Sequence, residues 1–426
     1  MDVLSLAIGK QHTRDVFATA NFPPYFPPNL LEEWLAMDTL DGWSISLQGN
    51  DTVEIVNEID TSHWPPEAKS RINTHLPNGK ETCLKLNVHS GTSMIYEFSQ
   101  PIDLTGKALG VLVFIDTVGK SAPSSQLLRV LFLSATSNAY VFPLEVKNCL
   151  DNNWFLFTFH PMEHRKWNNP DWSDIRSVRF IPQLSQGENI SVYVSSIFQI
   201  TNTRSRGAIM IDFDDGSTSA FTEAYRYMTG EYGYRGNCFI NGKYIDERRP
   251  NYVTPEMLLR MQDDGWVIGN HTWTHTNWRG EPYEKQREHL IRNMEWMARQ
   301  GFWFGNQVYA CTNYSMDYNM YHNLRSLGFK TIRAVYYNGR GGYITPAITR
   351  IPYCQPIPSN EINNTVSLET WRAHLQDVQD SKALAVNVFH DIGGSGSTST
   401  EHFRALIDEI QNYDIDVITY ADLLMM

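Results

Sequence analysis

Long apolar runs are missing from this sequence of 426 residues. A helix needs about 20 consecutive apolar residues to cross a bilayer, and no segment of the chain approaches that length. The opening residues, MDVLSLAIGKQHTR, also lack the basic stretch and the small-residue cleavage site of a secretory signal. The sequence therefore predicts a protein with no membrane span and no secretory leader of its own.

Cysteine and positive charge are also scarce. The five cysteines are scattered and none has the CxxC spacing, so they predict neither a disulfide framework nor a thiolate zinc site. The 35 Lys and Arg are outnumbered by 47 Asp and Glu, which gives a formal net charge of -12. Proteins that bind nucleic acid backbones need clustered basic side chains. We therefore expect no nucleic acid partner and no membrane partner.

The chain does contain enough apolar and aromatic residues for two folded units. Apolar residues make up 42% of the sequence, charged residues 19% and aromatic residues 12%, which is typical of a folded chain rather than a disordered one. Its length favours two units of about 200 residues each. The many Trp and Tyr suit stacking on sugar rings, but they suit a β-rich core equally well.

Residues 41–203 show the periodicity of β-strands. From Thr82 to Ile200, short runs such as CLKLNVH, GVLVFID and WFLFTFH alternate apolar and polar positions, and turn-forming residues separate them. This pattern predicts an antiparallel β-sandwich or jelly roll. The preceding residues 1–40 contain two Pro-Pro pairs, at 23–24 and 27–28. Because proline fixes φ and removes a donor, they predict an extended N-terminal arm.

Residues 204–426 change to alternating strands and helices. The predicted strands include GAIMIDFD, RGNCFIN, WVIGNHTW, QVYACTN, KTIRAVY, TRIPY and ALAVNVFHD, and amphipathic helical segments lie between most of them. One of these helices is opened by Thr254 and Pro255. Repeated βα units predict an α/β fold with parallel strands, either an open sheet or a (β/α) barrel. In both architectures the functional residues lie at the carboxyl ends of the strands.

Three predicted strand ends carry clusters of ionisable residues, in the segments 212–216 (DFDDG), 270–275 (NHTWTH) and 389–391 (FHD). Each cluster alone has a plain structural explanation, since Asp-Asp-Gly is common in turns. Paired histidines are likewise more often solvated or packed in a core than bound to metal. The coincidence of three clusters at one edge of the predicted sheet indicates a functional site.

His271 and His275 are four residues apart, so both imidazoles project to one side if the chain coils there. With a carboxylate from another strand end they would form an open site of two imidazoles and one carboxylate. Such a site suits a divalent metal, with zinc as the first choice and cobalt, nickel or manganese as alternatives. A metal with open positions can activate water and polarise a carbonyl, which are the two effects that hydrolysis needs.

The motifs IDFDDG, GNHTWTH and VFHD, in that order on a βα-repeat, resemble the polysaccharide deacetylases of carbohydrate esterase family 4, the NodB homology group. The resemblance implies a distorted (β/α) barrel that removes acetyl groups from N-acetylglucosamine polymers or acetylated xylan. It also implies that Asp215, His271 and His275 bind the metal. Asp214 would be the general base toward a metal-activated water, and His390 would protonate the leaving group.

The N-terminal half carries a second resemblance. The segment MIYEFSQPIDLTGKALGVLVFI, with NNWFLFTF further on, resembles the galactose-binding jelly-roll domains that are often joined to carbohydrate-active enzymes. This implies a carbohydrate-binding module, with a structural or oligomerising module as the alternative. The opening LSLAIGKQHT resembles that of phage virion proteins. Assembly into a virion would take the protein outside the cell without a signal peptide, and a cytoplasmic location is the alternative.

The chain departs from the family pattern at the run that orients the base. Where the family has an Arg-Pro-Pro-Tyr-Gly-like segment, this chain has CTNYS at 311–315, without arginine. The resemblance assigns oxyanion stabilisation to a backbone amide near Tyr314. We expect Arg350 or Arg333, near other predicted strand ends, to replace the missing guanidinium. The Asp-Trp element that supports the catalytic histidine in the family is also not recognisable, although Asp391 follows His390 directly.

Three further residues near the motifs call for an explanation. Asp212 shares a strand face with Asp214, so an additional cation, or an arginine beside one carboxylate, is expected there. Trp273 lies between the two histidines, and Trp278 follows them. These two side chains would form a wall for a sugar ring or, in the favoured alternative, pack at the barrel rim.

Three functional hypotheses remain open from the sequence. The first is metal-dependent deacetylation of an acetylated polysaccharide or oligosaccharide, with the protein acting alone, as a homo-oligomer or in a virion. The second is a glycan-binding or virion structural protein with a degenerate deacetylase domain, in which the missing arginine has abolished catalysis. The third is a metal-dependent amidohydrolase acting on a small amide. The appended β domain argues against the third, and the presence of both Asp214 and His390 argues against the second.

Overall fold

The computed structural model describes residues 31–120, 126–145, 152–160, 166–184, 190–200, 204–338, 343–344, 356–393 and 398–425. The chain divides into two compact units, with the boundary between Thr203 and Arg204, where the sequence changes its periodicity. Among these residues no helix combines the length and the apolar character that crossing a membrane requires.

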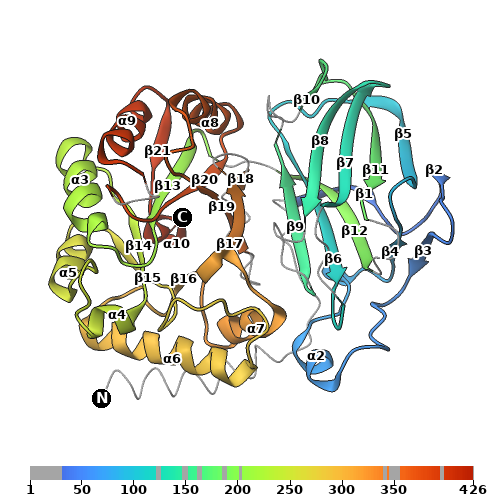
Figure 1. Ribbon diagram of the computed structural model, residues 1–426. Coiled ribbons are helices and arrows are strands. Elements are labelled where there is room, and N and C mark those ends of the chain that lie inside the picture. Colours follow the sequence, from blue (N-terminus) through green and yellow to red (C-terminus); the bar gives the residue numbers. More distant parts are fainter. Residues whose placement is uncertain are drawn as a thin grey trace. The chain divides into compact units, whose positions relative to one another are not determined.

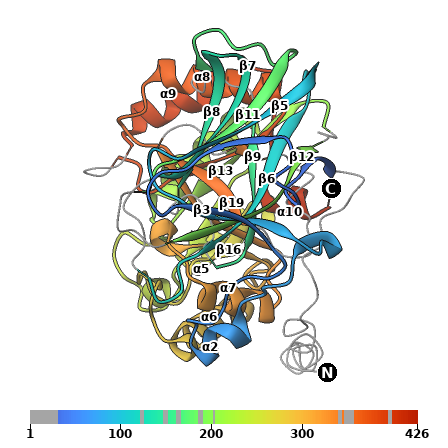
Figure 2. The same ribbon diagram turned by 90° about the vertical axis from the view of Figure 1, so that its right-hand side faces the viewer.

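The N-terminal unit consists of two antiparallel sheets of six strands each (Figures 1 and 2). One sheet has the order β3-β4-β12-β6-β9, with β1 paired to β12, and the other has the order β10-β8-β7-β11-β5-β2. Aromatic side chains join the two sheets, since Phe159 of the first packs against Phe142 and Phe132 of the second at ring distances of 4.5 and 6.0 Å. The predicted antiparallel sandwich is confirmed, and the more specific jelly-roll topology stays a prediction.

Fourteen helices and strands follow one another along the described part of this unit. They are β1 (Leu31–Ala36), β2 (Trp43–Ser46), β3 (Thr52–Val56), α2 (Pro66–Arg71), η1 (Pro77–Gly79), β4 (Cys83–Asn87), β5 (Ser93–Ile102), β6 (Ala108–Asp116), β7 (Gln126–Ala135), β8 (Asn138–Glu145), β9 (Trp154–Phe159), β10 (Lys166–Trp167), β11 (Ile175–Pro182) and β12 (Ser191–Ile200).

The predicted N-terminal arm of residues 1–40 extends too far. Leu31–Ala36 is strand β1, which pairs antiparallel with β12, and Trp34 stacks on Phe98 at 4.7 Å. After the second Pro-Pro pair every residue up to Ala36 keeps its backbone donor, so this segment can join a sheet and bury its apolar side chains. The Pro-Pro pairs themselves lie outside the described residues.

The C-terminal unit is built on a closed ring of seven parallel strands (Figure 1). Strands β13, β14, β15, β16, β17, β19 and β20 follow one another, and β20 pairs back to β13 to close the ring. Strand β21 runs parallel beside β13, and β18 runs antiparallel beside β20. Helices lie around the outside of the strands. The predicted α/β barrel is confirmed.

The strands of this unit are β13 (Gly207–Phe213), β14 (Asn237–Ile240), β15 (Val267–Asn270), β16 (Val308–Ala310), β17 (Thr331–Asn338), β18 (Tyr343–Ile344), β19 (Pro356–Glu361), β20 (Leu384–Phe389) and β21 (Ile415–Val417). The helical segments are η4 (Ala220–Tyr225), α3 (Arg226–Tyr232), α4 (Gly242–Asp246), α5 (Pro255–Asp263), α6 (Tyr283–Gln300), η5 (Thr312–Tyr314), α7 (Tyr318–Ser326), α8 (Leu368–Ser381), α9 (Thr400–Ile410) and α10 (Tyr420–Met425).

Local sequence signals explain most of these boundaries. Thr254 caps α5 by accepting a hydrogen bond from the Met257 amide at 3.3 Å, with Pro255 in the first turn, as predicted. Strand β19 was not predicted, because Pro356 and Pro358 lack the donors of an ordinary inner strand. The predicted strand TRIPY, at 349–353, lies outside the described residues.

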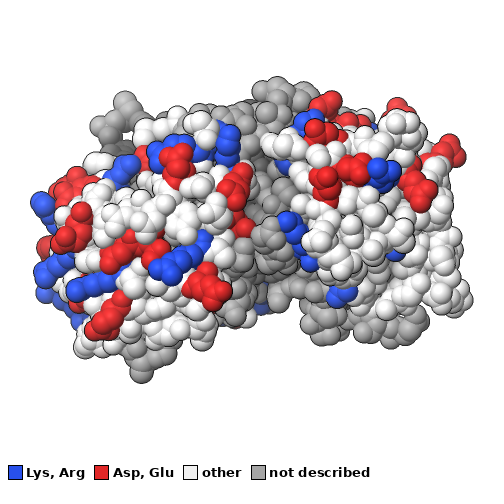
Figure 3. Space-filling model, turned by 90° about the horizontal axis from the view of Figure 1, so that it is seen from above, with Lys and Arg blue, Asp and Glu red and all other residues white. Residues whose placement is uncertain are grey.

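Charged side chains of both signs are interspersed on the face shown in Figure 3. Blue and red groups alternate over each unit on this face rather than forming one large patch of either sign. Ion pairs also occur on the C-terminal unit, such as Arg372 with Glu409. Exposed pairs of this kind contribute little to stability, because solvent screens them.

Candidate active site

The predicted site residues follow the carboxyl ends of three barrel strands. Asp214 and Asp215 follow β13, His271 follows β15, and His390 follows β20. Parallel strands place these ends at the same edge of the barrel. The Asp214 amide donates to the Phe389 carbonyl at 3.1 Å, which joins the first and third of these ends directly.

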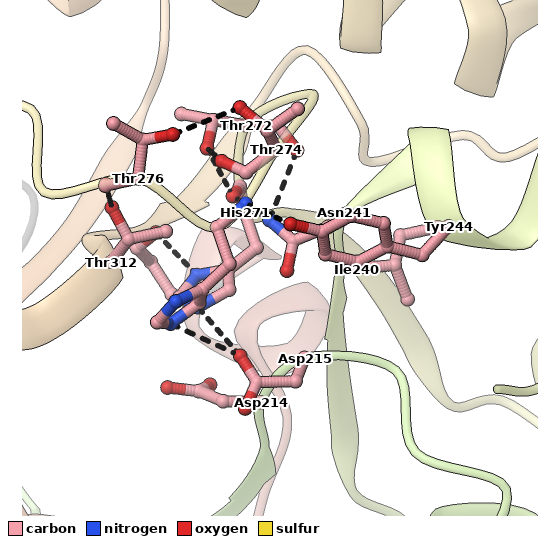
Figure 4. Close-up of polar contacts among 12 residues, drawn as sticks. Asp214, Asp215, Ile240, Asn241, Tyr244, His271, Thr272, Thr274, Thr276 and Thr312 are labelled. Atoms are coloured by element: carbon pink, nitrogen blue, oxygen red, sulfur yellow. Dashed lines mark hydrogen bonds and ion pairs between the residues drawn. The ribbon is translucent and has the colours of Figure 1, made fainter. Parts of the chain in front are cut away.

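Asp215, His271 and His275 converge on one point (Figure 4). Asp215 Oδ1 lies 3.4 Å from His271 Nε2 and 3.3 Å from His275 Nε2. Ligand atoms around a tetrahedral ion with bonds of about 2.1 Å are about 3.4 Å apart, so these separations fit a zinc-like ion. Asp215 Oδ1 is buried and has no hydrogen-bond partner. A buried carboxylate oxygen without a partner is unfavourable unless a cation binds it, so the residues fit a metal.

Hydrogen bonding and charge prepare these three side chains for a cation. His271 Nδ1 lies 2.8 Å from the Ala310 carbonyl, so Nδ1 carries the hydrogen and Nε2 faces Asp215 with its lone pair. Burial would raise the pKa of Asp215, but the neighbouring His271 and the charge of His275 lower it to about 2. Burial lowers the pKa of His275, which favours the neutral imidazole that binds metal.

The loops that carry the ligands contain strained backbone. Asp215 and Thr272 have φ of 69° and 65°, and the consecutive residues Asn313 and Tyr314 have φ of 54° and 52°. Left-handed conformations in non-glycine residues cost roughly 1–3 kcal/mol each and collect at functional sites. Thr272 is held by Asn270 Oδ1, which accepts from its amide at 2.8 Å, and its hydroxyl accepts from Trp278 Nε1 at 3.0 Å. These bonds fix the turn that directs His271 and His275 to the same side without a helix.

Arg333 of β17 lies between Asp212 and Asp214. Its Nη2 donates to Asp214 Oδ2 at 2.6 Å, and its Nε lies 3.2 Å from Asp212 Oδ2. Asp212 also accepts from Asn237 Nδ2 at 2.8 Å and from the Tyr420 hydroxyl at 3.1 Å. The side chains of Asp212 and Arg333 are fully buried, and that of Asp214 is nearly so. Arg333 therefore supplies, beside Asp214, the guanidinium that the segment 311–315 lacks.

The two carboxylates respond differently to Arg333. Burial raises the pKa of Asp212 to about 7, although the Arg333 charge opposes the rise. Burial acts on Asp214 in the same sense, but Arg333 and the nearby histidines outweigh it and hold the pKa of Asp214 below its usual value. The same two carboxylates raise the pKa of Arg333 against the effect of burial. Asp214 is thus the ionised carboxylate next to the candidate metal ligands.

Comparisons with known proteins agree on this unit. Residues 201–332 match the family model described as polysaccharide deacetylase. The chain is 26% identical over 111 residues to the peptidoglycan-N-acetylmuramic acid deacetylase PdaA of Bacillus subtilis (strain 168), which covers 25% of this chain and 39% of PdaA. It is 32% identical over 85 residues to the putative polysaccharide deacetylase YxkH of the same organism, covering 20% of this chain and 29% of YxkH. Residues 201–332, nearly all of them in the C-terminal unit, are therefore similar to a polysaccharide deacetylase domain.

Solved structures were also matched over the deacetylase domain. The Xyl-CE4 domain of a multidomain xylanase from the hindgut metagenome of Trinervitermes trinervoides is 15% identical, covers 52% of this chain and 90% of its own, and has a TM-score of 0.38. A putative polysaccharide deacetylase from Mycobacterium smegmatis is 15% identical, covers 53% of this chain and 92% of its own, and has a TM-score of 0.40.

His390 stands at the end of β20 in the deacetylase domain, and its side chain is partly buried. Its ring meets the Tyr314 ring edge-on at 6.4 Å. The described part of the chain provides no hydrogen-bond partner for its ring nitrogens. The backbone on either side of His390 therefore sets its position.

Four other predicted residues have structural surroundings that bear on their roles. The Tyr314 amide donates to the Cys311 carbonyl at 3.1 Å, so its proposed oxyanion role stays a prediction and requires this amide to be shared. Trp273 is 5% exposed and Trp278 is fully buried, which fits the alternative of rim packing and leaves little ring surface for a sugar. Asp212 is likewise buried, with Arg333 and not a substrate as its neighbour. Arg350 lies outside the described residues.

The sequence reasoning missed several residues that build the deacetylase site. Asn241, which follows β14, donates from Nδ2 to the Thr272 carbonyl at 3.2 Å and so supports the histidine loop (Figure 4). Ser217 and Ser219 donate to Asp391 across the two loops. A polar residue directly after a strand is the signal that could have identified Asn241, and the DDGSTS run could have identified the serines.

Proposed function

We propose that the deacetylase domain is a metal-dependent hydrolase that removes acetyl groups from a polysaccharide. The observation that carries the proposal is the convergence of Asp215, His271 and His275, with Asp215 Oδ1 buried and without a hydrogen-bond partner. The site combines this ligand set with an ionised carboxylate on one side and an imidazole on another, which is the equipment of a hydrolase that activates water.

Asp215, His271 and His275 would hold the metal. Two imidazole nitrogens and one carboxylate oxygen at near-tetrahedral separations favour zinc, with cobalt, nickel or manganese as alternatives. When bound, the ion would supply Lewis acidity, which acidifies water and polarises the acetyl carbonyl. The side chains of Asp215 and His275 are about one-third exposed, so solvent and substrate can reach this point.

Asp214 would act as the general base. It is adjacent to Asp215 in the chain but is bound to Arg333 and not to the histidines, so it is free to accept a proton. The guanidinium fixes the carboxylate and also keeps its pKa low, which makes it a well-positioned but weak base. Arg333 is then a positioning residue, and its presence removes the main reason for considering the domain degenerate.

His390 would act as the general acid. In the hydrolysis, oxygen from water adds to the acetyl carbon, and the bond from that carbon to the sugar nitrogen or oxygen breaks. The proton from His390 goes to the departing sugar atom, and the products are acetate and a free amine or hydroxyl. The acid must face the leaving group while the base faces the water, and β20 and β13 present these two groups from neighbouring strands.

The substrate class follows from the relatives and stays a proposal for this chain. PdaA is described as acting on N-acetylmuramic acid in peptidoglycan, and the family model as acting on polysaccharide. The substrate panel should therefore contain peptidoglycan fragments, N-acetylated chitooligosaccharides and acetylated xylan. We also propose that the N-terminal sandwich is a carbohydrate-binding or structural module.

The proposal is tested by acetate release from this panel by the full chain, with and without a chelator. We expect release from at least one substrate, loss on chelation, and recovery when zinc is returned. Asp214→Asn should reduce the rate by about 10² or more, since general bases contribute about 10²–10⁴. Asp263→Asn, an exposed change of the same chemistry on α5, is the matched control. Metal-loaded protein that releases no acetate from any of these substrates would favour the binding-protein alternative.

A further inference from the structure

A small hydrogen-bond cluster joins the loop after β13 to the loop after β20. Ser217 Oγ donates to Asp391 Oδ1 at 2.8 Å, and Ser219 Oγ donates to the same oxygen at 2.6 Å. The Ile392 amide then donates back to Ser219 Oγ at 2.9 Å. We call Ser217, Ser219 and Asp391 the serine–aspartate latch.

The latch is adjacent to His390 in the chain. The residue before His390 is fixed by the bond from the Asp214 amide to the Phe389 carbonyl, at 3.1 Å. The residue after it, Asp391, is fixed by the two serines. Further on, the Gly393 amide donates to the Thr398 carbonyl at 2.8 Å, which closes the turn. Because the described residues offer the His390 ring no hydrogen bond, these main-chain restraints fix the backbone from which the imidazole projects.

We propose that the serine–aspartate latch positions His390 for proton donation, and that Asp391, Ser217 and Ser219 are positioning residues of the reaction. The inference rests on the proposed hydrolase function and adds residues to it. The loop after β13 carries both the base Asp214 and the two serines, so a single loop sets the distance between base and acid. Misplacing a catalytic group by about 1 Å can reduce the rate 10²-fold, which makes such a restraint useful.

The latch acts through geometry rather than charge in this proposal. Asp391 is exposed, so solvent screens its charge from His390. Its Oδ1 atom accepts the hydrogen bonds from both serine hydroxyls. Asparagine at position 391 retains an oxygen that accepts from both serines. Asp391→Asn should therefore preserve the latch, and Asp391→Ala should release it.

The leaving group separates a positioning role from a general structural role. When an N-acetylated sugar is hydrolysed, the leaving group is the sugar amine. Its nitrogen needs a proton, so this hydrolysis depends on the acid. Hydrolysis of 4-nitrophenyl acetate releases 4-nitrophenolate, which is a stable anion and needs no proton from the acid. A released latch should therefore slow the first reaction and spare the second, whereas damage to the metal or the base would slow both.

The experiment measures chelator-sensitive hydrolysis of N,N'-diacetylchitobiose-type oligosaccharides, peptidoglycan fragments and 4-nitrophenyl acetate by the full chain. Asp391→Ala and the Ser217→Ala/Ser219→Ala double variant should lower kcat on the N-acetylated substrate about 10²-fold with KM unchanged. Hydrolysis of 4-nitrophenyl acetate should stay near the wild-type rate. Asp391→Asn should be close to wild type, and Glu401→Ala, an exposed carboxylate lost from α9, is the control.

The triple variant gives a second check, because the effects of substitutions within one hydrogen-bond cluster are not additive. Combining Asp391→Ala with the two serine variants should lower kcat by less than the product of the two separate effects, although the Ser219 hydroxyl also accepts from the Ile392 amide. Equal losses on both substrates, or an Asp391→Asn variant as slow as Asp391→Ala, would overturn the latch while leaving the hydrolase intact. Wild-type protein without activity on any substrate would instead refute the proposed function and the latch with it.

A crystal structure of Asp391→Ala provides a readout that does not depend on activity. We expect His390 to be displaced or spread over several rotamers, with the pair of Asp214 and Arg333 unchanged. An unmoved His390 in this variant would overturn the inference.

Discussion

Arg333 makes it possible for two acidic residues to share one buried face of β13. Asp212 and Asp214 are 0% and 2% exposed, and a single guanidinium contacts both. Removing one partner from a buried ionic cluster leaves uncompensated charge, which is far more destabilising than the net stability that the cluster provides. Asn237 donates to Oδ1 of Asp212, and Tyr420 donates to Oδ2, the oxygen next to Arg333, so the cluster has a defined geometry.

Arg333→Met should therefore lower the free energy of unfolding by about 3–5 kcal/mol, because two buried carboxylates lose their cation. Adding Asp212→Asn to this variant should recover part of the loss, since only one carboxylate then remains unpaired. Urea denaturation at a fixed zinc concentration measures both values. Arg292→Met, which removes an exposed guanidinium stacked on Trp273 at 4.5 Å, is the control and should change stability little. A double variant no more stable than Arg333→Met would contradict the shared-cation account.

Strand β13 lies unusually close to helix α8, and Gly207 permits this approach. A Cβ atom on Gly207 would come within 2.3 Å of the Val378 carbonyl oxygen, which is backbone and cannot rotate away. The first residue of β13 and the last turn of α8 are thus in direct contact. Because β13 carries the loop with Asp214 and Asp215, this packing also sets the height of the site in the barrel.

Gly207→Ala should destabilise the C-terminal unit by about 1–3 kcal/mol, the usual cost of overpacking a core. Gly230→Ala provides the opposite case, because Gly230 lies within α3 with open space where its Cβ would be, at a φ that alanine adopts readily. That substitution should stabilise by about 0.5–1 kcal/mol. Thermal unfolding of the two variants compares them directly, and a neutral Gly207→Ala would mean that α8 can move away from β13.

The sequence predicted the elements of the barrel unevenly. Strands such as Gly207–Phe213 and Leu384–Phe389 are apolar except for Asp212 and Asn387, so their burial within a parallel sheet could be predicted. Strand β19 could not, because PIPSNE has two prolines and polar residues yet pairs with β17 and β20. Its neighbours supply the hydrogen bonds and the burial that its own sequence does not indicate, so tertiary context overrides propensity.

At the scale of the whole molecule, each unit has its own core, and within the described residues the candidate metal centre lies in the C-terminal unit. Phe114, Phe132 and Phe180 are among the fully buried side chains of the sandwich, and Trp266, Trp296 and Trp371 among those of the barrel. A metal that binds the folded state alone stabilises by about 2.7 kcal/mol at 100 times its Kd. Its contribution should appear in the unfolding of the barrel.

Calorimetry of the full chain should therefore show a transition that shifts to lower temperature on chelation and returns with zinc. Asp215→Ala should remove the response to zinc, whereas Phe132→Ala, which deletes a buried ring of the sandwich, should leave it intact. Phe132→Ala should itself lower the stability of the sandwich by about 3–5 kcal/mol. A zinc response that survives in Asp215→Ala would place the metal elsewhere.

The sequence by itself determined the two periodicities and the three motifs, because strand alternation, βα repetition and the spacing of DFDDG, NHTWTH and FHD are local patterns. It also limited the replacement arginine to Arg333 or Arg350. Only the tertiary structure decided that Arg333 contacts Asp214, and that Ser217 and Ser219 contact Asp391. These pairs are separated by more than a hundred residues, and the closure of the ring through the pairing of β20 with β13 brings their strand ends together. No local pattern contains that closure, since it is fixed by the packing of all seven strands at once.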